Sequence, residues 1–136
     1  MATRSNIRGV TLMELLIVIV VVSILASIAI PSYRNYLIRT QRTDATAALL
    51  RLAAAQEKFY LQNNTYTTEL GNAGLNLGTT SEHGWYTINV AVATNTGFRA
   101  TATPVAGGAQ ASDAHCASFS INETGRRDAT NTDCWR

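Results

Sequence analysis

The positions of apolar and polar residues divide the chain into two parts. Between Val10 and Ile30 the only charged residue is Glu14, whereas charged and polar residues recur throughout the rest of the chain. As an α-helix, residues 10–30 have a length of roughly 31 Å, which is about the hydrocarbon thickness of a bilayer. This segment is therefore predicted to cross a membrane once. Pro31 follows directly and favours a kink or local melting, because proline cannot donate the backbone hydrogen bond of a helix.

A second helical pattern follows Pro31 and extends to about Leu61. Its apolar side chains recur at spacings of three and four, which is the period of an amphipathic helix. These apolar positions are Ala45, Ala48, Leu49, Leu52, Ala55 and Phe59. The positions predicted to form the solvated face are Arg39, Arg42, Thr43, Thr46, Arg51 and Lys58. Asn63 and Asn64 supply the signal that ends the helix.

The combined length of the two helical patterns has a consequence for assembly. A continuous helix over residues 10–62 is roughly 80 Å long, which is more than the remaining residues can cover as a compact domain. One end of the helix is therefore expected to protrude. An apolar rod outside lipid is stable only when it packs against copies of itself, which favours a filament with a helical core.

The C-terminal half alternates between apolar and polar residues, as half-buried strands do. Residues 85–93 and 98–103 are predicted to form one hairpin, and residues 117–121 and 126–129 a second one. Residues 64–84 are rich in Asn, Gly, Thr and Ser and are expected to be an irregular connection. The predicted fold class is α+β, with a long N-terminal helix packed on a four-stranded antiparallel sheet. The positions expected to face inward are Tyr86, Ile88, Val90, Val92, Phe98, Ala100 and Ala102.

Charge predicts the orientation of the membrane span. The formal net charge is +2, and two of the basic residues, Arg4 and Arg8, precede the apolar segment. Positive charge before a span favours a cytoplasmic N-terminus, with everything after about Ser32 outside the cytoplasm. Without those two arginines, nine basic residues face nine acidic ones. A chain so balanced lacks the overall charge of a strong nucleic-acid binder.

The short basic start differs from an ordinary secretory signal. Such a signal has a small-residue cleavage site after its apolar region, and none follows Ile30. The apolar helix is therefore expected to be retained. Glu14 is the anomaly within it, because a carboxylate inside a membrane helix costs on the order of 3 kcal/mol on insertion scales. Two interpretations stay open: Glu14 has a functional role, or it lies at headgroup depth.

The residues around Glu14 resemble a known sequence motif. The string from Gly9 through Val10-Thr11-Leu12-Met13-Glu14-Leu15-Leu16 to Val20 looks like the class III leader junction of type IV prepilins. This resemblance implies that a prepilin peptidase cuts after Gly9 and that Val10 is then N-methylated. It also implies that Glu14 pairs with the terminal amine of a neighbouring subunit. The family usually has phenylalanine after the cut, so Val10 is a departure.

Physical chemistry gives this arrangement a rationale. A buried carboxylate is tolerable beside a positive partner, and cleavage after Gly9 creates one by exposing the α-amine of Val10. Glu14 is one helical turn from Val10, so the pair is sterically compatible with one chain or with two. Our hypothesis is the pair between subunits.

The rest of the chain resembles the short, four-stranded minor pilins. The matching strings are Gln56-Glu57-Lys58-Phe59-Tyr60, Tyr66-Thr67, Tyr86-Thr87-Ile88, Phe98-Arg99-Ala100-Thr101-Ala102, and Cys116 with Cys134-Trp135. The resemblance implies a leader over residues 1–9, a transmembrane and filament-core helix over 10–31, and a periplasmic or extracellular domain over 32–136. The implied partners are prepilin peptidase, other pilin subunits in a helical filament, the inner membrane and the pilus assembly platform. The implied location is the inner membrane, and then the extracellular filament.

The two cysteines, Cys116 and Cys134, are predicted to form a disulfide in an oxidising periplasm. The alternative is a reactive thiol beside His115. Adjacent residues in a strand point to opposite faces, and nothing supplies a base, an orienting group and a pocket together. We therefore expect no enzyme, and neither a metal nor another cofactor.

A local basic patch leaves one further function open. Arg126, Arg127 and Arg136 lie inside or beside the predicted disulfide loop and could contact phosphate. We favour solvated turn residues over this interpretation, because aromatic residues other than Trp135 are missing from the patch. Three functions therefore remain open. The first is a minor pilin for assembly, twitching motility or adhesion, and the second is a major pilin or a type II secretion pseudopilin. The third is an anchored receptor for DNA, as in natural transformation, or for a surface ligand, which it would bind through the disulfide loop. The disulfide argues against the pseudopilin.

Overall fold

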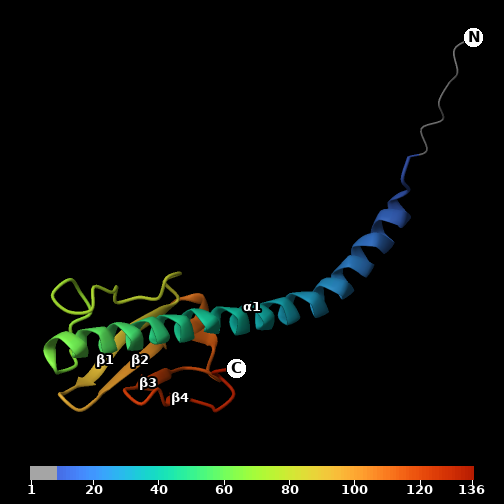
Figure 1. Cartoon of the computed structure of the whole chain (residues 1–136). Coiled ribbons are helices and arrows are strands. Elements are labelled where there is room, and N and C mark those ends of the chain that lie inside the picture. Colours follow the sequence, from blue (N-terminus) through green and yellow to red (C-terminus); the bar gives the residue numbers. More distant parts are fainter. Residues whose placement is uncertain (1–8) are drawn as a thin grey trace, which may run out of the picture. The chain divides into compact units, whose positions relative to one another are not determined.

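One long helix and one four-stranded sheet make up most of the regular structure (Figure 1). The computed structural model describes residues 9–136, so the expectations for Arg4, Arg8 and the rest of the leader lie outside the described residues. The elements are α1 (Leu12–Asn63), β1 (Tyr86–Ala93), β2 (Phe98–Pro104), the short 3-10 helix η1 (Ala109–Ser112), β3 (Phe119–Asn122) and β4 (Arg127–Ala129). The chain divides into two compact units, the second of which is Leu37–Arg136.

Helix α1 runs through both units. The hydroxyl of Thr11 accepts a hydrogen bond from the backbone N–H of Glu14 at 3.2 Å, which satisfies one free donor at the helix start. The helix continues through Pro31, so the local melting expected there does not occur, and a kink stays a prediction. It ends at Asn63, and Asn64 follows with a positive φ of 54°, as the two asparagines predicted. Among the described residues, α1 is the one helix long and apolar enough to span a membrane.

The sheet has the strand order β1-β2-β3-β4, and each neighbouring pair is antiparallel. This arrangement confirms the two predicted hairpins, with β3 beginning at Phe119 instead of residue 117. Just before β3, the backbone N–H of Ser118 donates to the side-chain hydroxyl of Thr130. At this position a side chain takes the place of the backbone acceptor that a neighbouring strand would supply. The prediction for Val92 was wrong: its side chain is 53% exposed. The register shifts between Val90 and Val92, and such a bulge reverses the face of the residues beyond it.

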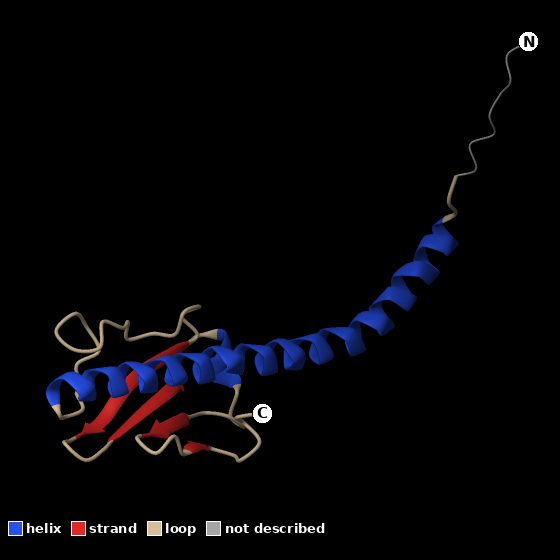
Figure 2. Ribbon diagram, in the orientation of Figure 1, coloured by secondary structure: helices blue, strands red, loops and turns tan. Residues whose placement is uncertain are grey.

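The hydrophobic core lies between α1 and one face of the sheet. In the second unit the helix covers that face along the strands (Figure 2). The buried side chains from α1 are Ala45, Leu49 and Leu52. Those from the sheet are Tyr86, Ile88, Val90, Phe98, Ala100, Ala102, Phe119 and Ile121. No helix of the described residues covers the opposite face of the sheet (Figure 2).

The irregular connection between α1 and β1 is held by a buried polar contact and two leucines. Gln56 is fully buried, donates to the carbonyl of Thr67 at 2.6 Å and accepts the Thr67 N–H at 3.1 Å. Leu70 and Leu75 add apolar contacts to the core. The connection is therefore irregular but fixed to the helix and the core by these contacts.

Candidate functional site

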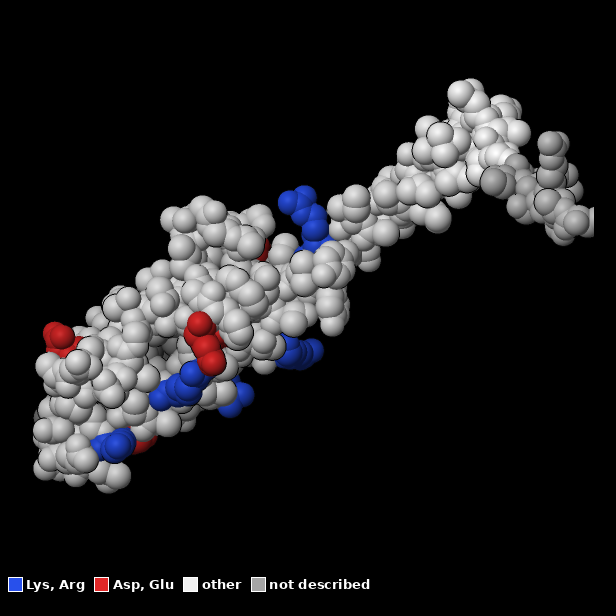
Figure 3. Space-filling model, turned by 90° about the horizontal axis from the view of Figure 1, so that it is seen from above, with Lys and Arg blue, Asp and Glu red and all other residues white. Residues whose placement is uncertain are grey.

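The N-terminal part of the described chain presents an almost wholly apolar surface. Large apolar side chains from Val10 to Ile30 have exposed fractions between 47% and 84%. No charged side chain is in view on this part of the helix in Figure 3. The hydroxyls of Ser23 and Ser27 donate to the carbonyls of Ile19 and Ile24, so they are satisfied within the helix. Such a surface is unstable in water and requires lipid or protein around it.

Glu14 lies in the first turn of α1, two residues after the helix begins at Leu12. A carboxylate at this end of a helix interacts favourably with the free N–H groups and the helix dipole. Gly9 and Val10 precede the helix, so the predicted cleavage bond is outside regular structure.

The segment that leads into the disulfide loop is anchored to α1 by a buried ion pair. Arg42 donates to both carboxylate oxygens of Asp113, at 2.7 Å and 2.8 Å. The side chains are 16% and 3% exposed, so the prediction that Arg42 belongs to the solvated face was wrong. Burial acts to raise the pKa of Asp113, but the hydrogen bonds and charge of Arg42 together hold it below its ordinary value. The carboxylate also accepts the Cys116 N–H at 3.3 Å, which links the pair to the disulfide.

A second anchor lies one turn away on the same helix. Gln110, in η1, is almost fully buried and donates to the carbonyl of Ile38 at 3.1 Å. It also donates to the side-chain oxygen of Gln41 at 2.7 Å. Residues 38–42 of the helix therefore hold residues 110–116, which lead into the disulfide loop, in one orientation.

The predicted disulfide between Cys116 and Cys134 is confirmed. Both cysteines are buried, whereas His115 is exposed and lies 3.0 Å from a carboxylate oxygen of Asp133. A nitrogen of His115 and the two sulfurs lie within 4.8 Å of one another, but both sulfurs are committed to the disulfide. A thiolate nucleophile or metal ligand is therefore not available here.

The three arginines expected to form one patch do not gather. Arg127 pairs with Ile121 across β3 and β4, so the two side chains share the face that α1 covers. Its guanidinium carbon lies 5.4 Å from the centroid of the Trp135 ring, as in a cation–π contact. Arg126 points to the opposite face, and Arg136 is outside the pocket that Arg126 lines. Arg126 and Arg127 are adjacent in an extended chain, and their side chains therefore lie on opposite faces of the sheet.

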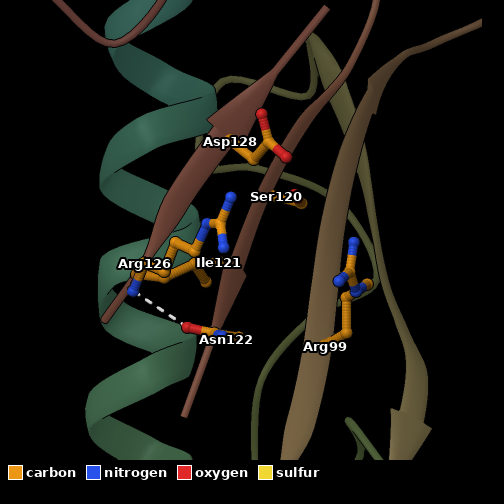
Figure 4. A pocket seen from close by; sticks show the side chains of 6 residues that line it. All are labelled: Arg99, Ser120, Ile121, Asn122, Arg126 and Asp128. Atoms are coloured by element: carbon orange, nitrogen blue, oxygen red, sulfur yellow. Dashed lines mark hydrogen bonds between the residues drawn. The ribbon is translucent and has the colours of Figure 1, made fainter. Parts of the chain in front are cut away.

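Arg126 instead lies near Arg99 on the outer face of the sheet, where both line one pocket. The two line a shallow pocket of about 150 Å³ together with Ser120, Ile121, Asn122 and Asp128 (Figure 4). The strand register brings these side chains together, because Arg99 of β2 lies opposite Asn122 of β3, and Ser120 of β3 lies opposite Asp128 of β4. Asn122 accepts the Arg126 N–H at 2.8 Å and so fixes the turn beside the pocket.

The two guanidinium groups of this pocket have no acidic partner among the ion pairs of the described residues. Two unpaired guanidinium groups from neighbouring strands form a site for an anion or for paired hydrogen-bond acceptors. Sequence reasoning missed Arg99. The alternation of Phe98, Arg99 and Ala100 indicates that Arg99 points outward, but only the pairing of β2 with β3 brings it to Arg126.

Two family models match the chain. The model described as "Prokaryotic N-terminal methylation motif" matches residues 4–30. The model described as "Type IV minor pilin ComP, DNA uptake sequence receptor" matches residues 31–120. By fold and by both matches, the chain belongs to the type IV pilin family.

Curated relatives and solved structures agree with this assignment. The chain is 38% identical over 60 residues to the type IV major pilin protein PilA of Myxococcus xanthus. That match covers 44% of this chain and 27% of the relative. This chain is also 35% identical over 68 residues to the type IV major pilin protein PilE of Neisseria gonorrhoeae. That match covers 50% of this chain and 41% of the relative. The chain thus spans less than half the length of these relatives.

Two solved structures share the fold. The non-core minor pilin PilV of Neisseria meningitidis has a TM-score of 0.55 and 19% identity. That alignment covers 72% of this chain and 91% of the other. A type IV pilin from Shewanella oneidensis has a TM-score of 0.51 and 24% identity, over 73% of this chain and 98% of the other. At these identities the likeness concerns the fold alone.

Proposed function

We propose that this chain is a minor pilin that enters a type IV pilus through α1. The observation that carries the proposal is the exposed, largely apolar surface of residues 10–30, in which Glu14 is the only charged residue. Lipid covers such a surface before assembly, and the same surfaces of neighbouring subunits cover it in a filament. The chain is a structural subunit in this proposal and performs no catalysis.

The proposed maturation supplies the partner that Glu14 lacks in the free chain. Prepilin peptidase cuts after Gly9 and methylates Val10, and the new terminal amine of one subunit pairs with Glu14 of its neighbour. An ion pair between subunits sets their axial stagger, because only one offset brings both groups together. The pair stabilises the filament most when lipid is excluded and the charges have no other partner.

Intact-mass spectrometry of sheared filaments and of membranes tests this proposal. The expected mass begins at Val10, carries one methyl group, and rises by two hydrogens on reduction of the disulfide. Glu14→Ala is expected to be cleaved yet absent from filaments. Ser23→Ala is the matched control on the same helix and should assemble normally. A full-length chain confined to membranes, or normal assembly of Glu14→Ala, contradicts the proposal.

The description of the family model that matches residues 31–120 supports a minor pilin over a major one. Abundance separates them, since a minor pilin is a small fraction of the protein in sheared filaments. A chain that accounts for most of the filament mass would overturn the assignment as minor.

The pocket of Arg99 and Arg126 favours a second function, binding of DNA. The matched family model carries the description of a DNA uptake sequence receptor, and this pocket presents two unpaired guanidinium groups on an open sheet face. A local cluster of this kind binds a nucleic acid even when the mature chain is near neutrality overall, because contacts to DNA are short-ranged at physiological salt.

Gel-shift titration of the full chain in detergent with duplex DNA tests this second function. Arg99→Ala combined with Arg126→Ala is expected to lower the affinity for DNA and to reduce the salt dependence of binding, because fewer phosphate counterions are released. Arg127→Ala is the matched control, since its side chain lies on the other face against Trp135. Equal losses in the double variant and the control would refute the pocket of Arg99 and Arg126 as the DNA-binding site. An absence of DNA binding in the unaltered chain would end this proposal.

A further inference from the structure

The pocket on the outer sheet face contains a carboxylate beside its two arginines. Asp128 lines it together with Arg99 and Arg126, and the three side chains project from β2, β4 and the turn before β4 (Figure 4). One oxygen of Asp128 accepts the N–H of Ala129 at 3.0 Å. Among the described residues, no ion pair joins Asp128 to either arginine. The second carboxylate oxygen is therefore available to accept a hydrogen bond from a ligand.

A site that held only a phosphate would be weakened by this residue. The carboxylate of Asp128 repels a phosphate at the short distances of one pocket. Two arginines with serine and asparagine already supply donors for a phosphate. The carboxylate therefore points to a ligand that has hydrogen-bond donors as well as acceptors.

The edge of a G·C pair in the DNA major groove has this combination. Guanine presents two adjacent acceptors, O6 and N7, which suit one guanidinium group, and cytosine presents the N4 amino donor, which suits a carboxylate. An A·T pair lacks two adjacent acceptors on one base and adds the thymine methyl group. The pocket has no apolar side chain facing outward to meet that methyl, because Ile121 is buried in the core.

The backbone places the two groups suitably for one base pair. Arg126 and Asp128 are two residues apart along an extended chain, so both point to the same side and lie roughly 7 Å apart at the backbone. They belong to the β3–β4 hairpin, a ribbon whose strand β4 forms one edge of the sheet, so this edge and the turn before it can approach the major groove of B-DNA. Arg99 lies on the neighbouring strand β2, opposite Asn122, at the side of this ribbon.

We propose that Asp128 determines sequence specificity at this site by accepting a hydrogen bond from cytosine N4 while Arg126 donates to O6 and N7 of the paired guanine. Arg99 contacts the backbone phosphate beside them. This inference rests on the proposed DNA-binding function and adds the base pair that is read and the residue that reads it. Asp128 contributes discrimination between sequences and lowers the affinity for DNA in general.

Selection from a randomised duplex pool, with the full chain in detergent, tests the inference. The unaltered chain is expected to enrich a motif with a G·C pair at one invariant position. Affinities for the selected duplex, for the same duplex with A·T at that position, and for a scrambled duplex are then measured by fluorescence anisotropy. Asp128→Ala is expected to bind the scrambled duplex more tightly and to lose about tenfold in preference for G·C.

Two further variants separate the roles of the residues. Arg99→Ala should weaken binding to all three duplexes by the same factor, whereas Arg126→Ala should also abolish the preference for G·C. Glu69→Gln removes one negative charge outside the pocket and is the matched control, expected to leave the preference unchanged. Circular dichroism of each variant confirms folding, which these exposed positions should not affect.

The outcomes distinguish this inference from the function on which it rests. If the unaltered chain binds DNA without sequence preference, or if Asp128→Ala keeps the preference for G·C, the role of Asp128 is refuted while DNA binding stands. If the unaltered chain binds none of the duplexes, both the role of Asp128 and the DNA-binding function are refuted.

Discussion

Replacing Arg42 by methionine is expected to destabilise the globular unit severely. Methionine keeps most of the apolar contacts of the arginine stem but removes the guanidinium group that pairs with Asp113. The Asp113 side chain is 3% exposed, so its charge would stay buried with only the Cys116 N–H as a partner. Removing one member of a buried ion pair typically costs about 3–5 kcal/mol, because the other charge is left uncompensated. We therefore expect a loss of this size at pH 7.

The pH dependence gives this prediction its particular signature. In the unaltered chain the pKa of Asp113 is held below its ordinary value of 3.8. Its contribution to stability is therefore present above the ordinary pKa and is lost as pH falls through the lowered one. In Arg42→Met, burial without the guanidinium raises the pKa of Asp113, so protonation relieves the penalty. The difference between the two proteins should accordingly shrink as pH is lowered from 7 to about 4.

Urea titration of the full chain in detergent, followed by tryptophan fluorescence at several pH values, measures this difference. Arg51→Met is the matched control, since Arg51 and Glu82 form an exposed pair with side chains 55% and 61% accessible. Exposed pairs contribute about 0–1 kcal/mol. Adding Asp113→Asn to Arg42→Met should restore part of the stability, because the amide is neutral and still accepts the Cys116 N–H. A loss below about 1 kcal/mol, or one that is constant with pH, would refute the reasoning.

Three other residues or pairs lead to separate expectations. Replacing Cys116 and Cys134 by serine should lower the free energy of unfolding by about 3 kcal/mol, and addition of a reductant to the unaltered protein should reproduce the loss in urea titrations. Gln56→Ala leaves the backbone groups of Thr67 without partners and should cost about 2 kcal/mol, with faster amide hydrogen exchange at Thr67; unchanged exchange would contradict it. Burial, with the carboxylate of Asp113 nearby, raises the pKa of Tyr86 to about 12. Stability should therefore fall as pH rises from about 10 to 12, and Tyr86→Phe should remove this fall at little cost, because the buried hydroxyl has no described partner.

The local pattern of apolar and polar residues was enough to predict the long helix, the irregular connection and the four strands. The period of apolar residues distinguishes helix from strand, and Asn63 and Asn64 ended the helix where expected. The cysteine pair was equally predictable, since only Cys116 and Cys134 are available. The leader motif with Glu14 was likewise visible from neighbouring residues. All of these features depend on residues close together in the sequence or on a unique pairing.

Tertiary structure decided which polar residues are buried and which gather. Arg42 has the spacing of a solvated residue, and only the position of Asp113, 71 residues later, turns it into a buried ion pair. The bulge after Val90 exposes Val92, which no alternation rule anticipates. Arg99, Arg126 and Asp128 line one pocket because β2 pairs with β3 and β3 pairs with β4. Arg126 and Arg127 point to opposite faces because successive residues of an extended chain do so. Register and burial are long-range properties of the packed sheet, and a local sequence pattern does not contain them.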